Sequence, residues 1–190
     1  MIKIVVQNKS YPAPLTTKQM TYVANRWKKN AQQMLRRQKH NASGELTRSI
    51  KVSKKIYQDK NEWSIELTPQ VNYWQFVDWG VSGTEKKYTR ESFDLINSDT
   101  RNFSYTNKKP PLSAMISWFK TKGYKGRNQE TGRFITDRAF GFALQNTIFK
   151  RGLKPSYFIS KTGNNILKKY SQSIGDAVAQ DIANITMELI

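Results

Sequence analysis

The residue types that perform most enzyme chemistry are few in this chain and far apart in its sequence. His40 is the only histidine and there is no cysteine, so neither a transition-metal site nor a histidine-activated nucleophile has the side chains it needs. A magnesium-dependent nuclease requires clustered carboxylates, whereas the 14 acidic residues are dispersed along the 190 positions. We therefore expect no catalytic residues, no metal site and no cofactor, and a protein that is not an enzyme.

The nearest approach to a phosphate-binding loop is the pair Gly80 and Gly83. The segment lacks the lysine–hydroxyl pair and the following helix that such a loop requires. Asp78 precedes these glycines inside an aromatic stretch, where we expect it to be buried, and the sequence identifies no partner for its carboxylate.

Positive charge is the strongest compositional feature. The chain has 32 Lys and Arg against 14 Asp and Glu, a net charge of +18, and residues 1–60 hold 14 basic and only 2 acidic residues. Such an asymmetry favours a polyanionic partner, most often nucleic acid, although a solvated basic face without a ligand remains an alternative. Six residues are the candidates that would face nucleic acid: Lys29, Arg36, Arg37, Lys39, Lys54 and Lys55.

Residues 71–83 form the densest aromatic run of the chain. Four rings fall within seven positions and two glycines follow, which makes six candidates for a subunit interface: Tyr73, Trp74, Phe76, Trp79, Gly80 and Gly83. A core strand that ends in a turn is the alternative, and the two interpretations are compatible. No positive charge lies between Pro69 and Lys86, whereas a platform that stacks single-stranded bases interleaves rings with cations. Contact with duplex DNA through phosphates fits better.

The elements that must position these residues follow from periodicity. Residues 2–6 predict a short strand. A helix follows, with a capping box formed by Thr16 and Gln19 and an apolar stripe at spacings of three and four residues. Alternation over residues 46–67, around a turn at 59–61, predicts a β-hairpin.

The second half of the chain is expected to be mainly helical. Residues 81–110 are irregular, and we expect them to extend from the domain and to order only against a neighbour. Helices are predicted from Pro111 to Gly123, over residues 137–151 and from near Thr162 onwards, with an extended segment at 154–159. The prediction is a single α+β domain, residues 1–190, in which a small antiparallel sheet packs against an N-terminal helix and a long C-terminal helix. An insertion of loops and helices is expected at about residues 84–150.

Three segments, in this order, resemble the tail-completion or neck proteins of the head–tail connector of tailed bacteriophages. Residues 42–52, Ala-Ser-Gly-Glu-Leu-Thr-Arg-Ser-Ile-Lys-Val, resemble a T-G-x-L-x-x-S-I-x-V segment that follows the first helix. Residues 71–80 resemble a Y-A-x-x-V-E-x-G-T segment, with Asp78 at the acidic position and Gly80 at the glycine. Residues 154–159 resemble a P-F-L element before the C-terminal helix. The chain departs from the pattern in the residues after Gly80 and in its insertion.

The resemblance implies a non-enzymatic structural protein of the virion. Members of the family assemble as rings, which implies a homo-oligomer of 6 or 12 copies, with a portal or adaptor protein above and a tail protein below. Double-stranded DNA would pass through the ring, and the protein would be made in the cytoplasm of the host bacterium. No run of 18 apolar residues occurs and the N-terminal apolar stretch is too short for a signal peptide, so no membrane partner is expected.

DNA inside the ring could neutralise only a fraction of the basic residues. Six copies at +18 each would carry +108, whereas a ring on the order of 40 Å tall encloses about 24 phosphates at one per roughly 1.7 Å of duplex. Most basic residues must therefore face something else, such as acidic surfaces of neighbouring rings. Two other functions stay open: a monomeric or dimeric nucleic-acid-binding protein, and a divergent nuclease.

Overall fold

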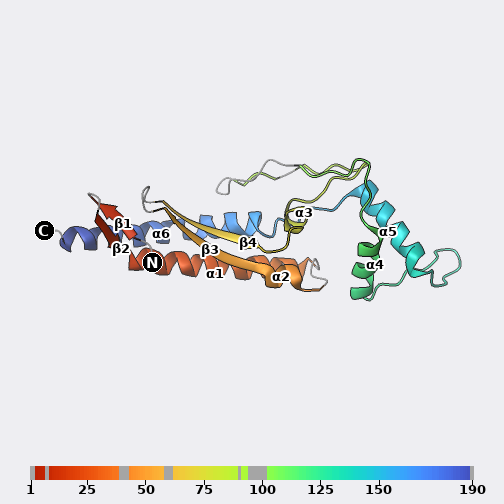
Figure 1. Ribbon diagram of the computed structural model, residues 1–190, viewed down its shortest axis with the longest axis horizontal. Coiled ribbons are helices and arrows are strands. Elements are labelled where there is room, and N and C mark those ends of the chain that lie inside the picture. Colours follow the sequence, from red (N-terminus) through yellow and green to blue (C-terminus); the bar gives the residue numbers. More distant parts are fainter. Residues whose placement is uncertain are drawn as a thin grey trace.

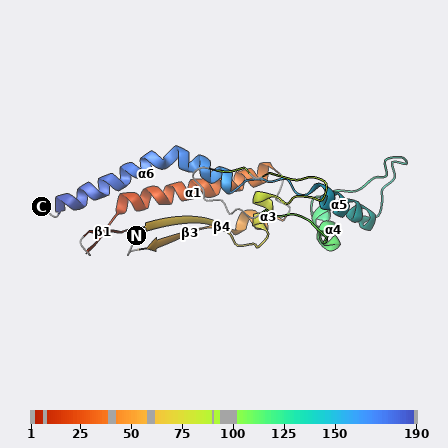
Figure 2. The same cartoon turned by 90° about the horizontal axis from the view of Figure 1, so that it is seen from above.

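Two long antiparallel helices form the axis of the molecule in the computed structural model, which describes residues 3–6, 9–38, 43–57, 62–89, 91–93 and 102–188. These helices are α1 (Pro14–Arg37) and α6 (Ser160–Glu188). They lie side by side along the long axis, and a smaller helical module occupies the end of the molecule opposite the C-terminus (Figures 1 and 2). The long C-terminal helix and the N-terminal helix of the prediction are therefore confirmed.

Helix α1 forms because its apolar residues recur on one face. Val23, Ala31 and Leu35 are buried, while the lysines and arginines lie on the opposite side, which leaves the helix amphipathic. The predicted capping box is wrong, because the helix begins at Pro14 after Ala13 and no side chain of the first turn caps it. The amide of Gln19 instead donates to the hydroxyl of Ser173 on α6, at 2.7 Å.

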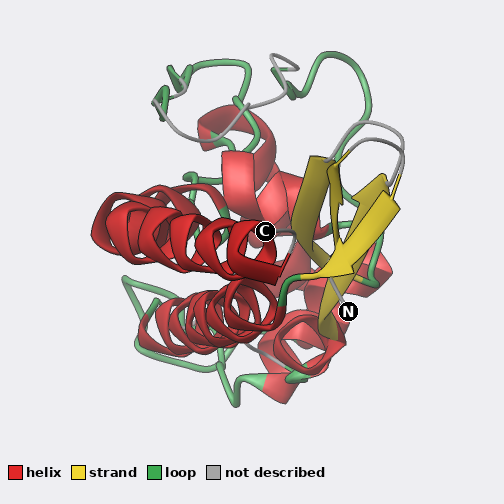
Figure 3. Ribbon diagram, turned by 90° about the vertical axis from the view of Figure 1, so that its left-hand side faces the viewer, coloured by secondary structure: helices red, strands yellow, loops and turns green. Residues whose placement is uncertain are grey.

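The strands form two separate antiparallel pairs. The first joins β1 (Lys3–Val6) to β2 (Lys9–Pro12), and the second joins β3 (Ile50–Tyr57) to β4 (Glu62–Pro69). Ile50 lies opposite Pro69 and Tyr57 opposite Glu62. Seen along the long axis, the strands lie beside the pair of long helices (Figure 3). The mixed class of small antiparallel sheets and helices is thus as predicted.

One part of the predicted hairpin is helical instead. Residues Glu45–Ser49 form a short helix, α2, that leads directly into β3. Leu46 and Ile50, both buried, are four residues apart, a spacing that places two residues on one face of a helix and equally on one face of a strand. The loose alternation of polar residues between them concealed the helical turn.

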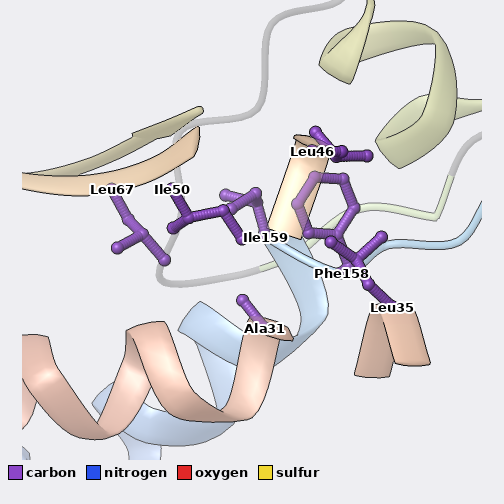
Figure 4. Packing of buried hydrophobic residues seen from close by; sticks show 7 residues of the cluster. All are labelled: Ala31, Leu35, Leu46, Ile50, Leu67, Phe158 and Ile159. Atoms are coloured by element: carbon purple, nitrogen blue, oxygen red, sulfur yellow. The ribbon is translucent and has the colours of Figure 1, made fainter. Parts of the chain in front are cut away.

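The main core lies where the C-terminal end of α1 and the start of α6 meet the β3–β4 hairpin. Its buried residues, labelled in Figure 4, come from α1, from the junction of α2 with β3, from β4 and from the segment just before α6: Ala31, Leu35, Leu46, Ile50, Leu67, Phe158 and Ile159. Trp27 of α1 packs on the edge of this cluster, and its indole N–H donates to the carbonyl of Ile159 at 3.1 Å. The core therefore fixes the start of α6 against α1 and the sheet.

The remote module consists of α4 (Leu112–Thr121) and α5 (Asp137–Arg151), close to the predicted bounds of both helices. Phe119 and Phe140 pack edge to face with their centroids 4.9 Å apart. A Cβ at Gly141 would lie 2.9 Å from the side chain of Ile116, so the absence of a side chain lets the two helices approach closely.

The segment between the aromatic run and α4 is tied to its own chain where it is described. Ser82 donates its N–H to the carbonyl of Phe103 at 2.8 Å, and Tyr105 donates back to the carbonyl of Ser82 at 2.9 Å. Residue 90 and residues 94–101 lie outside the described residues. Residues 81–86 also bond through their backbones to residues 149–153. The expectation that the whole of residues 81–110 orders only against a neighbour stays a prediction.

A buried carboxylate on α6 replaces the predicted cap of α1. Asp181 is 1% exposed and accepts hydrogen bonds from the backbone N–H groups of Leu15, at 3.2 Å, and Thr16, at 2.8 Å. The first N–H groups of a helix have no partner within the helix, and its N-terminus favours negative charge. Asp181 therefore joins the C-terminal half of α6 to the first turn of α1.

We predict that Asp181→Ala lowers the free energy of unfolding by about 2–4 kcal/mol, because two buried N–H groups lose their acceptor. Asp181→Asn, which keeps one oxygen, should lose less. Urea unfolding followed by circular dichroism measures both changes. The control is Asp176→Ala on the same helix: Asp176 accepts only an exposed bond from Gln172, at 2.9 Å, and its loss should cost less than about 0.5 kcal/mol. Equal effects at the two positions would contradict a capping role for Asp181.

Candidate interaction surfaces

The aromatic run folds as a helix, α3 (Trp74–Trp79), and not as the core strand that the sequence offered as an alternative. Val71, Trp74 and Val77 all pack against the main core. Their spacing of three residues is that of a helical face, a signal that the density of rings obscured. Tyr73 and Phe76 point away from the core and are 42% and 40% exposed.

Asp78 on this helix has the partners that the sequence did not reveal. Its side chain is fully buried and accepts from the N–H of Ile159 at 2.7 Å and from the hydroxyl of Ser160 at 2.5 Å. The backbone continues the connection, because Tyr157 donates its N–H to the carbonyl of Asp78 at 2.9 Å. The carboxylate thus lies at the N-terminus of α6, where the orphan N–H groups and the helix dipole stabilise it.

The glycines after α3 form a tight crossing within the chain. Val81 and Leu153 exchange two backbone hydrogen bonds, of 2.9 and 2.8 Å. A Cβ on Gly83 would overlap the carbonyl of Lys150 and come within 2.5 Å of the nitrogen of Gly152. Gly80 is also buried, against Leu153 and Pro155. Gly80 and Gly83, predicted as interface residues, therefore do not contribute to the exposed surface, since the backbone of their own chain covers them.

The two tryptophans are half-buried, and their neighbours form the exposed part. Trp79 donates its indole N–H to Ser160 at 3.3 Å and stacks on Phe103 with centroids 5.9 Å apart. Phe76 meets the same Phe103 ring edge to face at 4.5 Å. We name Tyr73, Phe76 and Phe103 the α3 surface. Burial, and then the negative charge of Glu45, raise the pKa of Tyr73, so its hydroxyl stays neutral at physiological pH.

The structure does not bring the basic candidates that it describes into one cluster. Lys29, Arg36 and Arg37 are exposed on α1, and the spacing of seven residues puts Lys29 and Arg36 on the same side of the helix. Lys54 and Lys55 lie in β3, which runs back from α2 toward the N-terminal end of α1 and so away from Arg36 (Figure 1). The side chains of Lys54 and Lys55, and the whole of Lys39, lie outside the described residues.

A second group of exposed rings was not predicted from the sequence. Trp118, Tyr124, Phe134 and Phe142 of the remote module are between 39% and 61% exposed. The signal for them was available, because Trp118 falls outside the apolar stripe of α4 and the other rings lie among lysines and arginines.

The geometry contains no metal-binding constellation in the described ranges, where no three histidine, cysteine or acidic side chains come close enough to hold an ion. No helix in the same part of the chain has the length and apolar character needed to cross a bilayer. Comparisons with protein families, with curated proteins and with solved structures find no match to this chain. A function must therefore be argued from the surfaces themselves and from the three segments that resemble neck proteins.

We predict that Gly83→Ala lowers the free energy of unfolding by about 2–3 kcal/mol, because backbone atoms surround the site and cannot move aside as a side chain can. Amide hydrogen exchange at Val81 and Leu153 should accelerate in this variant. The matched control is Gly175→Ala on α6, where no atom lies within 4 Å of the new Cβ. That change should be neutral or stabilise the helix by up to about 1 kcal/mol. Unchanged exchange at Val81 in Gly83→Ala would show that the crossing tolerates a side chain.

Proposed function

We propose that this chain is a non-enzymatic structural subunit of an oligomeric ring in the head–tail connector of a tailed bacteriophage. The observation that carries the proposal is that the three segments resembling neck proteins meet in one place. Leu46 and Ile50 come from the first segment, and Phe158 and Ile159 come from the third, and all four share the main core. Asp78, the acidic residue of the second segment, accepts the N–H of Ile159.

This convergence gives the segments a common physical purpose. Asp78 of the second segment accepts hydrogen bonds at the N-terminus of α6, the helix that follows the third segment. The first segment supplies Leu46 and Ile50 to the apolar core on which this helix start packs. Residues 78 and 159 are 81 positions apart, so their contact does not follow from proximity in the sequence. The three short matches contact one another around the start of α6. They therefore support the resemblance more strongly than three matches in unconnected places would.

The α3 surface is the candidate contact between subunits. Its rings are apolar and partly exposed, and the segment between Pro69 and Lys86 carries no positive charge. An apolar patch of this kind suits a contact between copies that each carry +18, because it adds attraction without adding like charge. In this proposal 6 or 12 copies close the ring, with a portal or adaptor protein above and a tail protein below.

Duplex DNA in the passage would meet the basic side of α1. Lys29, Arg36 and Arg37 are exposed there, and phosphate contacts of this kind require no base recognition. The protein would be made in the host bacterial cytoplasm and incorporated into the neck of the virion.

The second candidate is a monomeric or dimeric nucleic-acid-binding protein. The net charge of +18 and the basic face of α1 favour it, and neither requires a ring. The two proposals differ in the mass of the assembled protein, since a ring is a closed multimer.

We predict that Phe76→Glu prevents assembly while the monomer stays folded, because a charge on the α3 surface would be buried without a partner between subunits. Sedimentation analysis of the wild type and the variant gives the masses, and circular dichroism verifies the fold. Met187→Glu on α6, where the side chain is 69% exposed, is the control that should assemble normally. A wild type that remains monomeric or dimeric at all concentrations would favour the second candidate.

We further predict that neutralising Lys29, Arg36, Arg37 and Lys39 together leaves assembly intact and impairs retention or ejection of the genome. The physical reason is that phosphate contacts lose their counter-charges, whereas the apolar α3 surface is unchanged. Assembled particles carrying the variant can be counted by microscopy and their DNA content measured. Loss of ring docking with normal DNA behaviour would move these residues to a protein–protein contact.

A further inference from the structure

The loop between α4 and α5 is an ordered hairpin that projects at the end of the molecule opposite the C-terminus (Figure 1). Arg127 lies opposite Phe134 as an antiparallel bridge, and Asn128 donates its N–H to the carbonyl of Arg133 at 2.9 Å. The side-chain oxygen of Asn128 accepts from the N–H groups of Glu130 and Thr131, both at 2.9 Å. The turn is therefore closed by its own hydrogen bonds and presents its side chains in a fixed arrangement.

The exposed side chains of this end alternate between rings and cations. Phe134 is 61% exposed, the guanidinium carbon of Arg127 lies 4.4 Å from its ring centroid, and the ammonium of Lys125 lies at 5.7 Å. Trp118 and Tyr124, in the same module, meet edge to face with their ring centroids 5.7 Å apart. We name these residues, together with Arg133, the tip surface: Trp118, Tyr124, Lys125, Arg127, Arg133 and Phe134.

The tip surface carries uncompensated positive charge. Residues 118–142 contain six lysines and arginines and two acidic residues. One of those acids, Asp137, pairs with Lys120 at 3.0 Å. Within the described part of the chain, no ion pair engages Arg127 or Arg133. A ligand of this surface must therefore supply negative charge.

We propose that the tip surface binds single-stranded nucleic acid, with unpaired bases stacking on its rings and its cations contacting the phosphates. Rings and cations interleave at the tip, as they do in stacking platforms, whereas the aromatic run at residues 71–83 contains no lysine or arginine. Duplex DNA would offer the cations its phosphates but would keep its base faces stacked inside the helix. An acidic protein would also satisfy the cations, but it does not require rings interleaved with them, and it is an alternative outcome of the second test. The proposal does not depend on the ring.

The first test replaces Phe134 and measures the affinity for a fluorescent oligothymidylate of about 12 nucleotides. Phe134→Ala should weaken binding about tenfold, since stacking on one ring is lost, and should change the affinity for a duplex of the same length less than about twofold. Phe134→Leu keeps the apolar character without the π-face and should bind as poorly as the alanine variant. Phe134→Trp should restore binding. Wild-type affinity in Phe134→Leu, or equal losses for both oligonucleotides, would overturn the stacking proposal.

The second test separates the tip cations from the general charge of the protein. Arg127→Gln with Arg133→Gln removes two charges, and the matched control Lys108→Gln with Lys161→Gln removes two exposed charges elsewhere. The tip variant should lower the slope of log affinity against log salt by about 1.4, at about 0.7 for each phosphate contact. The control should change it by less than half of that. Identical slopes in the two variants, or intact binding in both, would overturn the proposal and leave an acidic protein as the partner of the tip.

Discussion

Two buried aspartates lie at the N-termini of the two long helices, at opposite ends of the body. Asp181, on α6, accepts the first N–H groups of α1, and Asp78, on α3, accepts the groups that begin α6. Because the helices are antiparallel, their N-termini lie at opposite ends of the body. At each N-terminus, unpaired donors and the helix dipole offset the cost of removing the carboxylate charge from water. Between the two ends, Gln19 and Trp27 donate to Ser173 and Thr162 and fix the same register. The positions of the hairpin, of α2 and of α3 all depend on this register.

The remote module joins the body at a close crossing of two backbone segments. The chain leaves at Val81 and returns at Leu153, where the two residues exchange backbone hydrogen bonds. Gly83 and Gly152 allow the two strands of chain to cross at a distance that no side chain permits. The α4–α5 module can therefore differ in length and content without disturbing the core, since the ends of the segment that carries it are already adjacent.

Regular elements were predictable where one period persisted over many residues. Helices α1, α4 and α5 and the strands of the β3–β4 hairpin follow from such periods, and helix ends at Pro111, Gly123 and Gly152 follow from turn chemistry. Short helices were not predictable in the same way, because α2 and α3 each span fewer than two turns and their spacing competes with neighbouring patterns. The caps were beyond local reasoning altogether. Asp181 lies 165 residues from Thr16, and no local signal distinguishes it from an exposed acid, whereas the false capping box at Thr16 and Gln19 had the expected local spacing.

The α3 surface and the basic side of α1 are expected to respond to salt in opposite ways, because the first consists of rings and the second of charges. The α3 surface consists of three aromatic rings, two of which, Tyr73 and Phe76, lie in a segment without lysine or arginine, so its attraction persists when charges are screened. Repulsion between copies of +18 weakens at the same time, because the Debye length falls to about 8 Å at physiological ionic strength. Contacts between α1 and phosphates weaken under the same conditions, since their affinity depends on the release of counterions. Under the proposed function, higher salt would thus favour association of subunits through α3 and disfavour DNA on α1, so one salt series would assign each kind of contact to its surface.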